Sequence, residues 1–339
     1  MPNYGNERSL FVLSGENSTI PSGELEALVE TYSSNSKISK ISRRIALVEG
    51  NINTEEILKR SAYVKLGGLY LGSINNSTEE NLRKIEFNGI ERINSFAARV
   101  YNISNQKNKL NLEAELGHIV KEKFPTAKVS LKAPETLIIG IISEDGFHIC
   151  GVDSDSIRRS WRERRPRARP FFHPSALYSK FARLLVNLSH VRGEDILLDP
   201  FCGTGSILIE SAYIGIRSIG IDISRKMCEG SMSNYKHFNL SKVDIIMATA
   251  NSLPVAKVDG IATDIPYGRV SSTHKQKVNC IAENIVNTIA TILPKGKFAC
   301  IVHPEVITLP KINAIEKVQE HKIYIHRSLT RVITLLKHV

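Results

Sequence analysis

Residues 196–210 read Ile-Leu-Leu-Asp-Pro-Phe-Cys-Gly-Thr-Gly-Ser-Ile-Leu-Ile-Glu. A short apolar run ends at Asp199, glycines follow at positions 203 and 205, and a second apolar run begins after Ser206. The first run has the length of a buried parallel strand. Gly203 and Gly205 lack a Cβ and so allow a sharp turn beside a ligand, and Ser206 suits the N-cap of a helix. The stretch predicts a strand, a glycine loop and a helix, the unit at which open parallel sheets bind nucleotides.

A second strand end narrows the class of ligand. The apolar run Ser218–Ile221 ends at Asp222, 17 residues after Gly205. A carboxylate at this position is where such sheets hold the hydroxyl groups of a ribose. The third glycine of the dinucleotide fingerprint is missing, since Ile207 and Leu208 fill that region, and no Gly-Lys-Ser/Thr ending of a P-loop is present.

A third strand end carries a different set of residues. The run Ala262–Gly268 reads Ala-Thr-Asp-Ile-Pro-Tyr-Gly and follows the short apolar stretch Asp259–Ile261. Taken alone, it is equally compatible with an ordinary strand end that carries an Asp turn and Pro266. The glycine loop upstream makes a functional interpretation of this run stronger, and Asp264 lies 65 residues after Asp199 of that loop.

Together these strings resemble one class of enzyme. Asp199–Ser206 resembles the nucleotide loop of S-adenosylmethionine-dependent methyltransferases that modify amino groups on nucleic-acid bases. Asp264–Tyr267 is similar to their Asp/Asn-Pro-Pro-Tyr motif, with Ile265 in place of the first proline. The resemblance implies an α/β fold with a doubly wound Rossmann-like domain and S-adenosyl-L-methionine as the cofactor. The catalytic residues that it implies are Asp264, Ile265, Pro266 and Tyr267.

Length and composition limit the remaining possibilities. The chain has 339 residues, 42% of them hydrophobic, which is enough for two or three domains with cores of their own. No signal segment opens the sequence, and the longest apolar run, Leu137–Ile142, is far below the ~18 residues that span a membrane. We therefore expect a cytoplasmic protein without a membrane segment. The five cysteines form no Cys-x-x-Cys pair, which argues against a disulfide framework and a zinc site.

The net charge of +11 is unevenly distributed. Residues 1–150 contain 18 basic and 18 acidic residues, so the whole excess lies in residues 151–339. A basic catalytic half favours a polyanionic substrate, although scattered lysines are also the usual way to keep a surface soluble.

The N-terminal half predicts two α+β segments. For residues 1–50 and the strand after them, the patterns predict strand 10–13, helix 24–32, strand 45–48, helix 51–60 and strand 63–70, the last interrupted by a glycine pair. This order fits a ferredoxin-like segment. For residues 51–152 we further predict strand 96–100, helix 112–124 and strands 128–131, 137–142 and 147–151.

The second of these segments resembles an RNA-binding domain. The phrases Ser95–Val100, Glu113–Gly117 and Lys128–Pro134 look like the THUMP domain. The resemblance implies that residues 51–152 grip the acceptor end of a tRNA.

Residues 153–170 break sharply from the rest in composition. Seven arginines fall between positions 158 and 169, together with Trp161, the only tryptophan of the chain. The arginine fork suits phosphate, and a neighbouring aromatic ring can stack on a base. A solvated, semi-rigid linker with prolines at 166 and 170 explains the stretch equally well. Under the RNA-binding interpretation the phosphate contacts are Arg158, Arg159, Arg162, Arg164, Arg165, Arg167 and Arg169.

The remainder, residues 171–339, closely resembles a narrower family. The run Phe171–Leu177, the helix predicted at 180–188 and the segment His326–Val332 are similar to archaeal tRNA methyltransferases that modify guanine 10 on N2. Relatives usually have Asp where Asn251 stands, and an Asn carbonyl can accept the same hydrogen bond from an adenine. The cofactor contacts that the resemblance implies are Asp199, Phe201, Gly203, Gly205, Asp222, Ile223, Asn251, Ser252, Phe172, Pro174 and Leu177.

The implied reaction is methyl transfer to the N2 amine of guanine 10 in tRNA, once or twice. Two acceptors, the Asp264 carboxylate and the Ile265 carbonyl, would activate the amine, while Tyr267 stacks on the base. Three alternatives stay open: transfer to guanine 6 of tRNA, a DNA adenine methyltransferase, and a non-catalytic tRNA-binding protein with a vestigial fold. The partner expected is tRNA, and the chain is expected to act as a monomer unless a small activator subunit joins it.

Overall fold

The computed structural model describes residues 8–40, 42–75, 79–87, 89–104, 111–153, 161–250, 253–266 and 272–339. The chain divides into two compact units. The N-terminal unit is Met1–Lys59 with Tyr63–Arg159, and the C-terminal unit is Arg60–Ala62 with Ser160–Val339.

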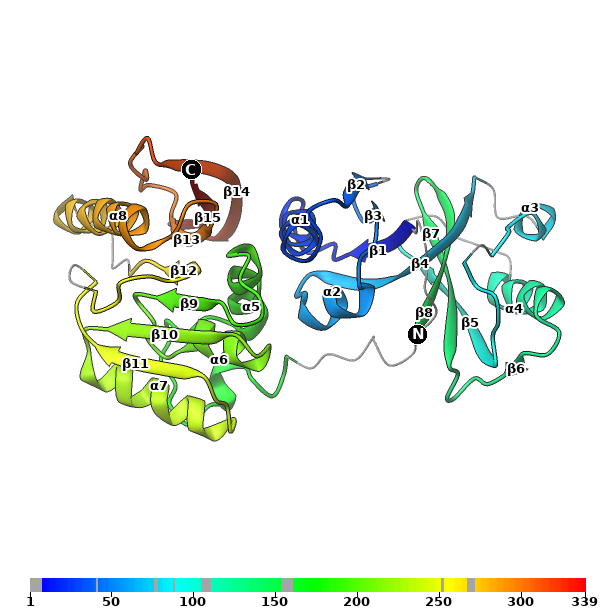
Figure 1. The fold of residues 1–339 in the computed structure, drawn as a ribbon, viewed down its shortest axis with the longest axis horizontal. Coiled ribbons are helices and arrows are strands. Elements are labelled where there is room, and N and C mark those ends of the chain that lie inside the picture. The colour runs from blue at the N-terminus through cyan, green and yellow to red at the C-terminus, as the bar shows by residue number, and fades with distance from the viewer. Residues whose placement is uncertain are drawn as a thin grey trace. The chain divides into compact units, whose positions relative to one another are not determined.

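One sheet of eight strands, in the order β2-β3-β1-β4-β8-β7-β5-β6, runs through the N-terminal unit (Figure 1). Its central strand β4 pairs antiparallel with β1 on one side and β8 on the other, so the two segments predicted at 1–50 and 51–152 share a single sheet. The elements are β1 (Arg8–Leu13), α1 (Ile20–Tyr32), β2 (Lys37–Lys40), β3 (Ile45–Glu49), α2 (Thr54–Arg60), β4 (Val64–Ile74), α3 (Glu79–Arg83), β5 (Ser95–Asn102), α4 (Leu112–Lys123), β6 (Lys128–Val129), β7 (Thr136–Ser143) and β8 (Gly146–Asp153).

The glycine pair in β4 does not interrupt that strand, contrary to the prediction. A Cβ on Gly67 would lie 2.5 Å from the ring of Phe11, and one on Gly68 would lie 2.3 Å from the Gly151 carbonyl oxygen. Both positions therefore need glycine because neighbouring strands pack against them, while β4 continues to Ile74.

Three apolar clusters hold this sheet. Helices α1 and α2 pack on β1, β3 and β4, and helices α3 and α4 pack on β4, β5, β7 and β8. A third cluster contains strand and loop residues alone, among them Leu10, Ile45, Ile139 and Cys150, each fully buried. This third cluster spans the neighbouring strands β3, β1, β4, β8 and β7, so it connects the two halves of the sheet.

The C-terminal unit is built on a seven-stranded sheet in the order β11-β10-β9-β12-β13-β15-β14. Strands β11, β10, β9, β12 and β13 are parallel, and β15 runs antiparallel between β13 and β14. This confirms the predicted doubly wound Rossmann-like domain. Its elements are α5 (Ser179–Leu188), β9 (Ile196–Asp199), α6 (Ser206–Tyr213), β10 (Arg217–Asp222), α7 (Arg225–His237), β11 (Val243–Met247), β12 (Gly260–Asp264), α8 (Ser272–Ile292), β13 (Phe298–Pro304), β14 (Ile315–His326) and β15 (Leu329–His338).

Helices cover both faces of this sheet. A Cβ on Gly220 in β10 would meet Leu208 of α6, whereas its neighbour Ile221 belongs to the core cluster that includes Ile285 and Ile289 of α8. Because successive strand residues point to opposite faces, α6 and α8 lie on opposite sides. In Figure 1 the arrowheads of β9, β10 and β11 point the same way, which brings their carboxyl ends to one edge.

The arginine-rich segment is part of the C-terminal unit from residue 160 onward. Arg164 and Arg169 are buried, whereas Arg162, Arg165 and Arg167 are exposed. Arg158 and Arg159 lie outside the described residues. The short 3-10 turn Pro166–Ala168 separates the two buried side chains.

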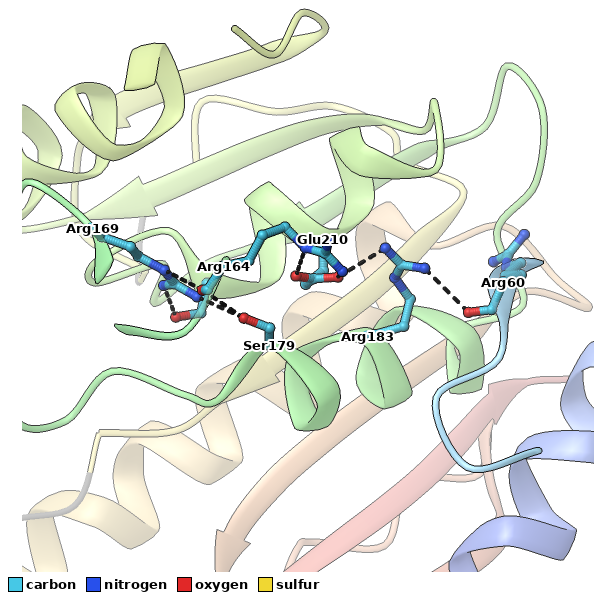
Figure 2. A network of polar contacts seen from close by, with 7 residues as sticks. Arg60, Arg164, Arg169, Ser179, Arg183 and Glu210 are labelled. Carbon is cyan, nitrogen blue, oxygen red and sulfur yellow. Dashed lines mark hydrogen bonds and ion pairs between the residues drawn. The ribbon is translucent and has the colours of Figure 1, made fainter. Parts of the chain in front are cut away.

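A buried network around Glu210 of α6 accounts for this pattern (Figure 2). Glu210 Oε1 accepts from Arg164 Nε at 2.7 Å, and Oε2 accepts from Arg183 Nη2 at 2.8 Å. Arg164 also stacks on the rings of Tyr213 and Trp161, at 3.9 and 5.3 Å from their centroids. The predicted phosphate contacts of Arg164 and Arg169 are therefore wrong, because both guanidinium groups lie inside the fold.

Candidate active site

A cavity of about 900 Å³ lies at the carboxyl ends of β9, β10 and β12 in the C-terminal unit. Each of these strands contributes its last residue, an aspartate: Asp199, Asp222 and Asp264. The other lining residues are Ser175, Ala176, Leu177, Pro200, Phe201, Cys202, Gly203, Thr204, Ser206, Ile207, Ile223, Ser224, Met227, Ala248, Thr249, Ala250, Ile265, Pro266, Ile281 and Arg331.

The glycine loop between β9 and α6 forms one wall. Gly203 and Gly205 have φ angles of 51° and 76°, in the left-handed region that favours glycine. Gly205 is the N-cap of α6, so the prediction that Ser206 takes this position is wrong. A Cβ on Gly205 would lie 2.2 Å from Ser231 Oγ of α7, so this glycine also lets the two helices approach.

Ser206 has a different role from the predicted cap. Its Oγ lies 2.6 Å from Arg169 Nη1 and accepts that hydrogen bond. Arg169 also donates from Nε to the Arg164 carbonyl oxygen at 3.0 Å. The glycine loop is thereby attached to the buried arginine network at the first residue of its helix.

Asp222 fixes the opposite side of the loop. Its Oδ2 accepts from the Gly203 N–H at 3.0 Å, and its Oδ1 accepts from the Ser224 N–H at 2.8 Å. These two bonds set the plane of the carboxylate at the cavity wall. Each oxygen keeps a further lone pair that can accept a hydrogen bond from a hydroxyl group.

Asp199 is the most deeply buried of the three carboxyl groups. Its Oδ1 accepts from Thr263 Oγ1 at 2.8 Å and from the Phe201 N–H at 3.2 Å. Burial raises the pKa of Asp199 to about 7, against these two hydrogen bonds, and the nearby Asp264 and Asp222 carboxylates act in the same direction as burial. Asp199 therefore links β9 to β12 beneath the cavity.

Asp264 differs from both in having an oxygen without a partner. Its Oδ1 is buried and makes no hydrogen bond to any described residue. Its Oδ2 lies 3.6 Å from Arg331 Nη2 of β15. Burial raises the pKa of Asp264 to about 6, while Arg331 acts in the opposite direction. A buried acceptor without a partner is costly, and because Asp264 lines the cavity, this oxygen is a candidate for binding a donor from a ligand.

The neighbouring residues explain the departure from the Asp-Pro-Pro-Tyr pattern. The Ile265 N–H donates to the Val302 carbonyl oxygen at 3.0 Å, a bond that a proline could not make. The Ile265 side chain is fully buried in the core cluster under α8, and Pro266 lines the cavity beside it. Tyr267 lies outside the described residues.

The other predicted site residues divide into three groups. Leu177, Phe201 and Ile223 line the cavity. The described lining residues do not include Gly205, Phe172 or Pro174, and the Phe172 side chain is 46% exposed. Asn251 and Ser252 lie outside the described residues.

Arg331 is the functional candidate to which the sequence analysis gave no role. It lies within the run His326–Val332, which was noted only for its resemblance. Its proximity to Asp264 depends on strand pairing between segments 67 residues apart, which neither local motif contains.

Two kinds of site are absent from the described part of the chain. No group of three His, Cys, Asp or Glu side chains there could hold a metal ion. Among the described helices, none is long and apolar enough to cross a membrane.

Two family models match the chain. The chain matches an RMKL-like methyltransferase domain over residues 166–333 and a DNA methylase model over residues 79–233. Among solved structures it is similar to TrmN from Thermus thermophilus, with a TM-score of 0.53 and 16% identity, over 98% of this chain and 100% of that one.

Curated relatives are closer in sequence. A tRNA (guanine(10)-N2)-dimethyltransferase from Methanocaldococcus jannaschii is 32% identical over 97% of this chain and 99% of its own length. One from Methanothermobacter thermautotrophicus is 31% identical over the same shares of the two chains. With 97% of this chain covered, both matches extend over both units. The chain therefore belongs to the tRNA (guanine(10)-N2)-dimethyltransferase family.

Proposed function

We propose that this protein methylates the N2 amine of guanine 10 in tRNA, with S-adenosyl-L-methionine as the methyl donor. The observation that carries the proposal is Asp264, a residue of the cavity wall whose buried Oδ1 has no hydrogen-bond partner among the described residues. Membership of the family supplies the substrate class.

The residues around the cavity fit the proposed cofactor. The volume of about 900 Å³ accommodates a nucleoside together with a flipped base. The Asp222 carboxylate, held by two backbone N–H groups, is oriented to accept ribose hydroxyls. When bound, S-adenosylmethionine supplies a methyl group on a positively charged sulfur.

Asp264 has the main chemical role in this proposal. The lone pair of the guanine amine is delocalised into the ring, and a charged acceptor at the N–H makes it more available. As the amine acquires positive charge, a carboxylate beside it stabilises the transition state and can take the proton. With a pKa raised to about 6, Asp264 is mostly ionised at neutral pH and still basic enough to accept that proton.

The RNA contacts proposed for this unit are reduced to three described arginines. Arg162, Arg165 and Arg167 are exposed on the segment that leads to the cavity residues. A guanine in a tRNA stem must leave its base pair, at a cost of a few kcal/mol, and binding elsewhere on the RNA can offset this. We assign that binding to these arginines and to the THUMP-like region of the N-terminal unit.

The finer properties belong to the same proposal. We expect a cytoplasmic protein that acts as a monomer on tRNA, with a small activator subunit as the alternative. The name of the family favours two successive methyl additions over one.

Nucleoside mass spectrometry tests the proposal directly. Purified protein, S-adenosylmethionine and an unmodified tRNA transcript should yield N2-methylguanosine and N2,N2-dimethylguanosine. A transcript with adenine in place of guanine 10 is the matched control and should yield neither product. Equal methylation of both transcripts would reject position 10, and no product from either would reject the activity.

A further inference from the structure

Arg331 reaches the active site from the last strand of the sheet. In the strand register, Arg331 of β15 lies opposite Pro304 at the end of β13, while Asp264 at the end of β12 lies opposite Val302 of the same strand. Its Nη2 is 3.6 Å from Asp264 Oδ2, and its guanidinium lies 6.0 Å from the centroid of the Phe181 ring of α5. The Arg331 side chain is 22% exposed and that of Asp264 is 17% exposed, so water screens this pair only partly.

The charges around the cavity make this contact important. Asp199, Asp222 and Asp264 line it at the ends of three neighbouring strands. Among the described lining residues, Arg331 is the only basic side chain. From the α8 side, the described lining residue is the apolar Ile281, and from the α5 side the aromatic Phe181 packs against Arg331. Within the described residues, the environment of Asp264 therefore contains two other carboxyl groups and one cation.

We propose that Arg331 is a positioning residue for methyl transfer. It binds Oδ2 of Asp264 and keeps the carboxylate charged, so that Oδ1 can accept a hydrogen bond from the guanine amine. This inference rests on the proposed function. The two oxygens then have separate tasks, since one faces the guanidinium and the other has no hydrogen-bond partner among the described residues.

The physical reason lies in what burial does to a carboxyl group. Removal from water favours the neutral acid, and neighbouring carboxylates favour it further. A neutral acid at Asp264 could neither stabilise positive charge on the amine nor accept its proton. A cation within about 4–6 Å lowers the pKa of a carboxyl group by roughly 1–3 units, which is enough to restore the charged form near pH 7.

The test is a pH–rate profile of single-turnover methyl transfer for wild type, Arg331→Gln and Arg331→Lys. In the wild type the rate should rise with pH as Asp264 ionises. Arg331→Gln should move this rise upward by about 1–3 pH units, so that its loss of rate is about fivefold to several hundredfold near pH 6 and shrinks as the pH increases. Arg331→Lys retains the positive charge and should return the rise toward its wild-type position.

Two further variants identify the titrating group. Asp264→Asn should abolish the rise, whereas Asp199→Asn should keep it. If Arg331→Gln loses rate equally at every pH, or if its rise does not move, Arg331 acts only on structure and the inference is overturned.

A second readout does not depend on turnover. Carbon-13 NMR of protein labelled at the aspartate carboxyl carbon, with Asp264→Asn to assign the signal, should show a higher pKa for Asp264 in Arg331→Gln than in the wild type. An unchanged pKa overturns the inference. If the wild type does not methylate the transcript but this pKa still moves, the proposed function fails while the hold of Arg331 on Asp264 stands.

Discussion

At the scale of single residues, two aspartates sit in places that disfavour their charged forms. Asp199 and Asp264 end adjacent strands, and burial raises the pKa of both. They differ in their partners, because Asp199 Oδ1 accepts two hydrogen bonds whereas Asp264 Oδ1 accepts none from a described residue. We therefore assign Asp199 to the framework of the site and Asp264 to its chemistry.

The first prediction concerns Asp264. Asp264→Ala should lower kcat by about 10²–10⁴-fold and leave KM for tRNA little changed, because the carboxylate acts mainly in the transition state. Asp264→Asn should be milder, since an amide oxygen still accepts one hydrogen bond. Steady-state kinetics with labelled cofactor measure both variants. Near-normal turnover of the alanine variant would mean that the active site lies elsewhere.

The second prediction concerns Asp199 and pH. Its pKa is about 7 in the folded protein and ~3.9 in an unfolded chain, so the wild type loses stability as the pH rises between these values. Asparagine stays neutral throughout. Asp199→Asn should therefore gain stability over the wild type, by little near pH 4 and by up to the order of 3–4 kcal/mol above pH 7. Urea unfolding at pH 5 and pH 8 measures this, and equal gains at both would contradict a raised pKa.

At the scale of elements, the arginine segment depends on one carboxylate of α6. Glu210 is fully buried and pairs with both Arg164 and Arg183, each less than 10% exposed. Burial lowers the pKa of Arg183 to about 10, with Glu210 opposing this effect. The network joins the segment before α5 to α5 and α6.

The third prediction follows from this network. Glu210→Ala leaves buried guanidinium groups without their carboxylate and should destabilise the protein by about 3–5 kcal/mol. The matched control is Glu229→Ala, which breaks an exposed ion pair with Arg225 on α7 and should change stability by less than about 1 kcal/mol. Denaturant unfolding compares the two variants. Similar losses of stability in both variants would show that the buried ion pairs of Glu210 contribute no more to stability than an exposed pair does.

The elements that sequence predicted well have local signals. The unit β9, glycine loop and α6 follows from an apolar run, two glycines and a second apolar run, and the structure has it with the helix start within one residue. Strand β14 (Ile315–His326) has no clear local signal, because most of its side chains are polar and exposed and show no alternation. Strand β2 (Lys37–Lys40) was missed because it is only four residues long and three of them are polar.

Other features could not be read from local sequence because distant residues decide them. Seven arginines between 158 and 169 look alike in sequence, yet the partners of the two buried ones, Glu210 for Arg164 and Ser206 for Arg169, lie 46 and 37 residues further along the chain. The Gly67–Gly68 pair resembled a break, but Phe11 and Gly151 require it. The contact of Arg331 with Asp264 likewise depends on the order of strands in the sheet.

At the scale of the whole molecule, charge separates the two halves of the sequence. Residues 1–150 are neutral overall and residues 151–339 carry the whole net charge of +11. The affinity of a protein for RNA depends on salt, and the dependence grows with each phosphate that a basic side chain neutralises. The exposed arginines of the segment before α5 are the candidates for this term.

The fourth prediction tests these arginines. Replacing Arg162, Arg165 and Arg167 with Gln should weaken tRNA binding and reduce the slope of log affinity against log salt by about 0.7–0.9 for each lost phosphate contact. The matched control replaces Lys242, Lys257 and Lys295 with Gln. These lysines precede β11, β12 and β13, at the opposite edge of the sheet from the cavity. This control removes the same charge and should change the slope less. Equal slopes for both triple variants would leave only a general effect of net charge.

Because β15 lies between β13 and β14 and is the last strand in sequence, the sheet cannot be completed until the end of the chain has been translated. A ribosome has to translate Leu329–His338 before β13 gains its neighbour on that side and before Arg331 can approach Asp264. Until then β13 presents an open edge of apolar residues, which is prone to pair with other chains. A message truncated ahead of Leu329 therefore encodes the glycine loop and all three aspartates, yet its product would be a substrate for proteases and chaperones before it could be a methyltransferase.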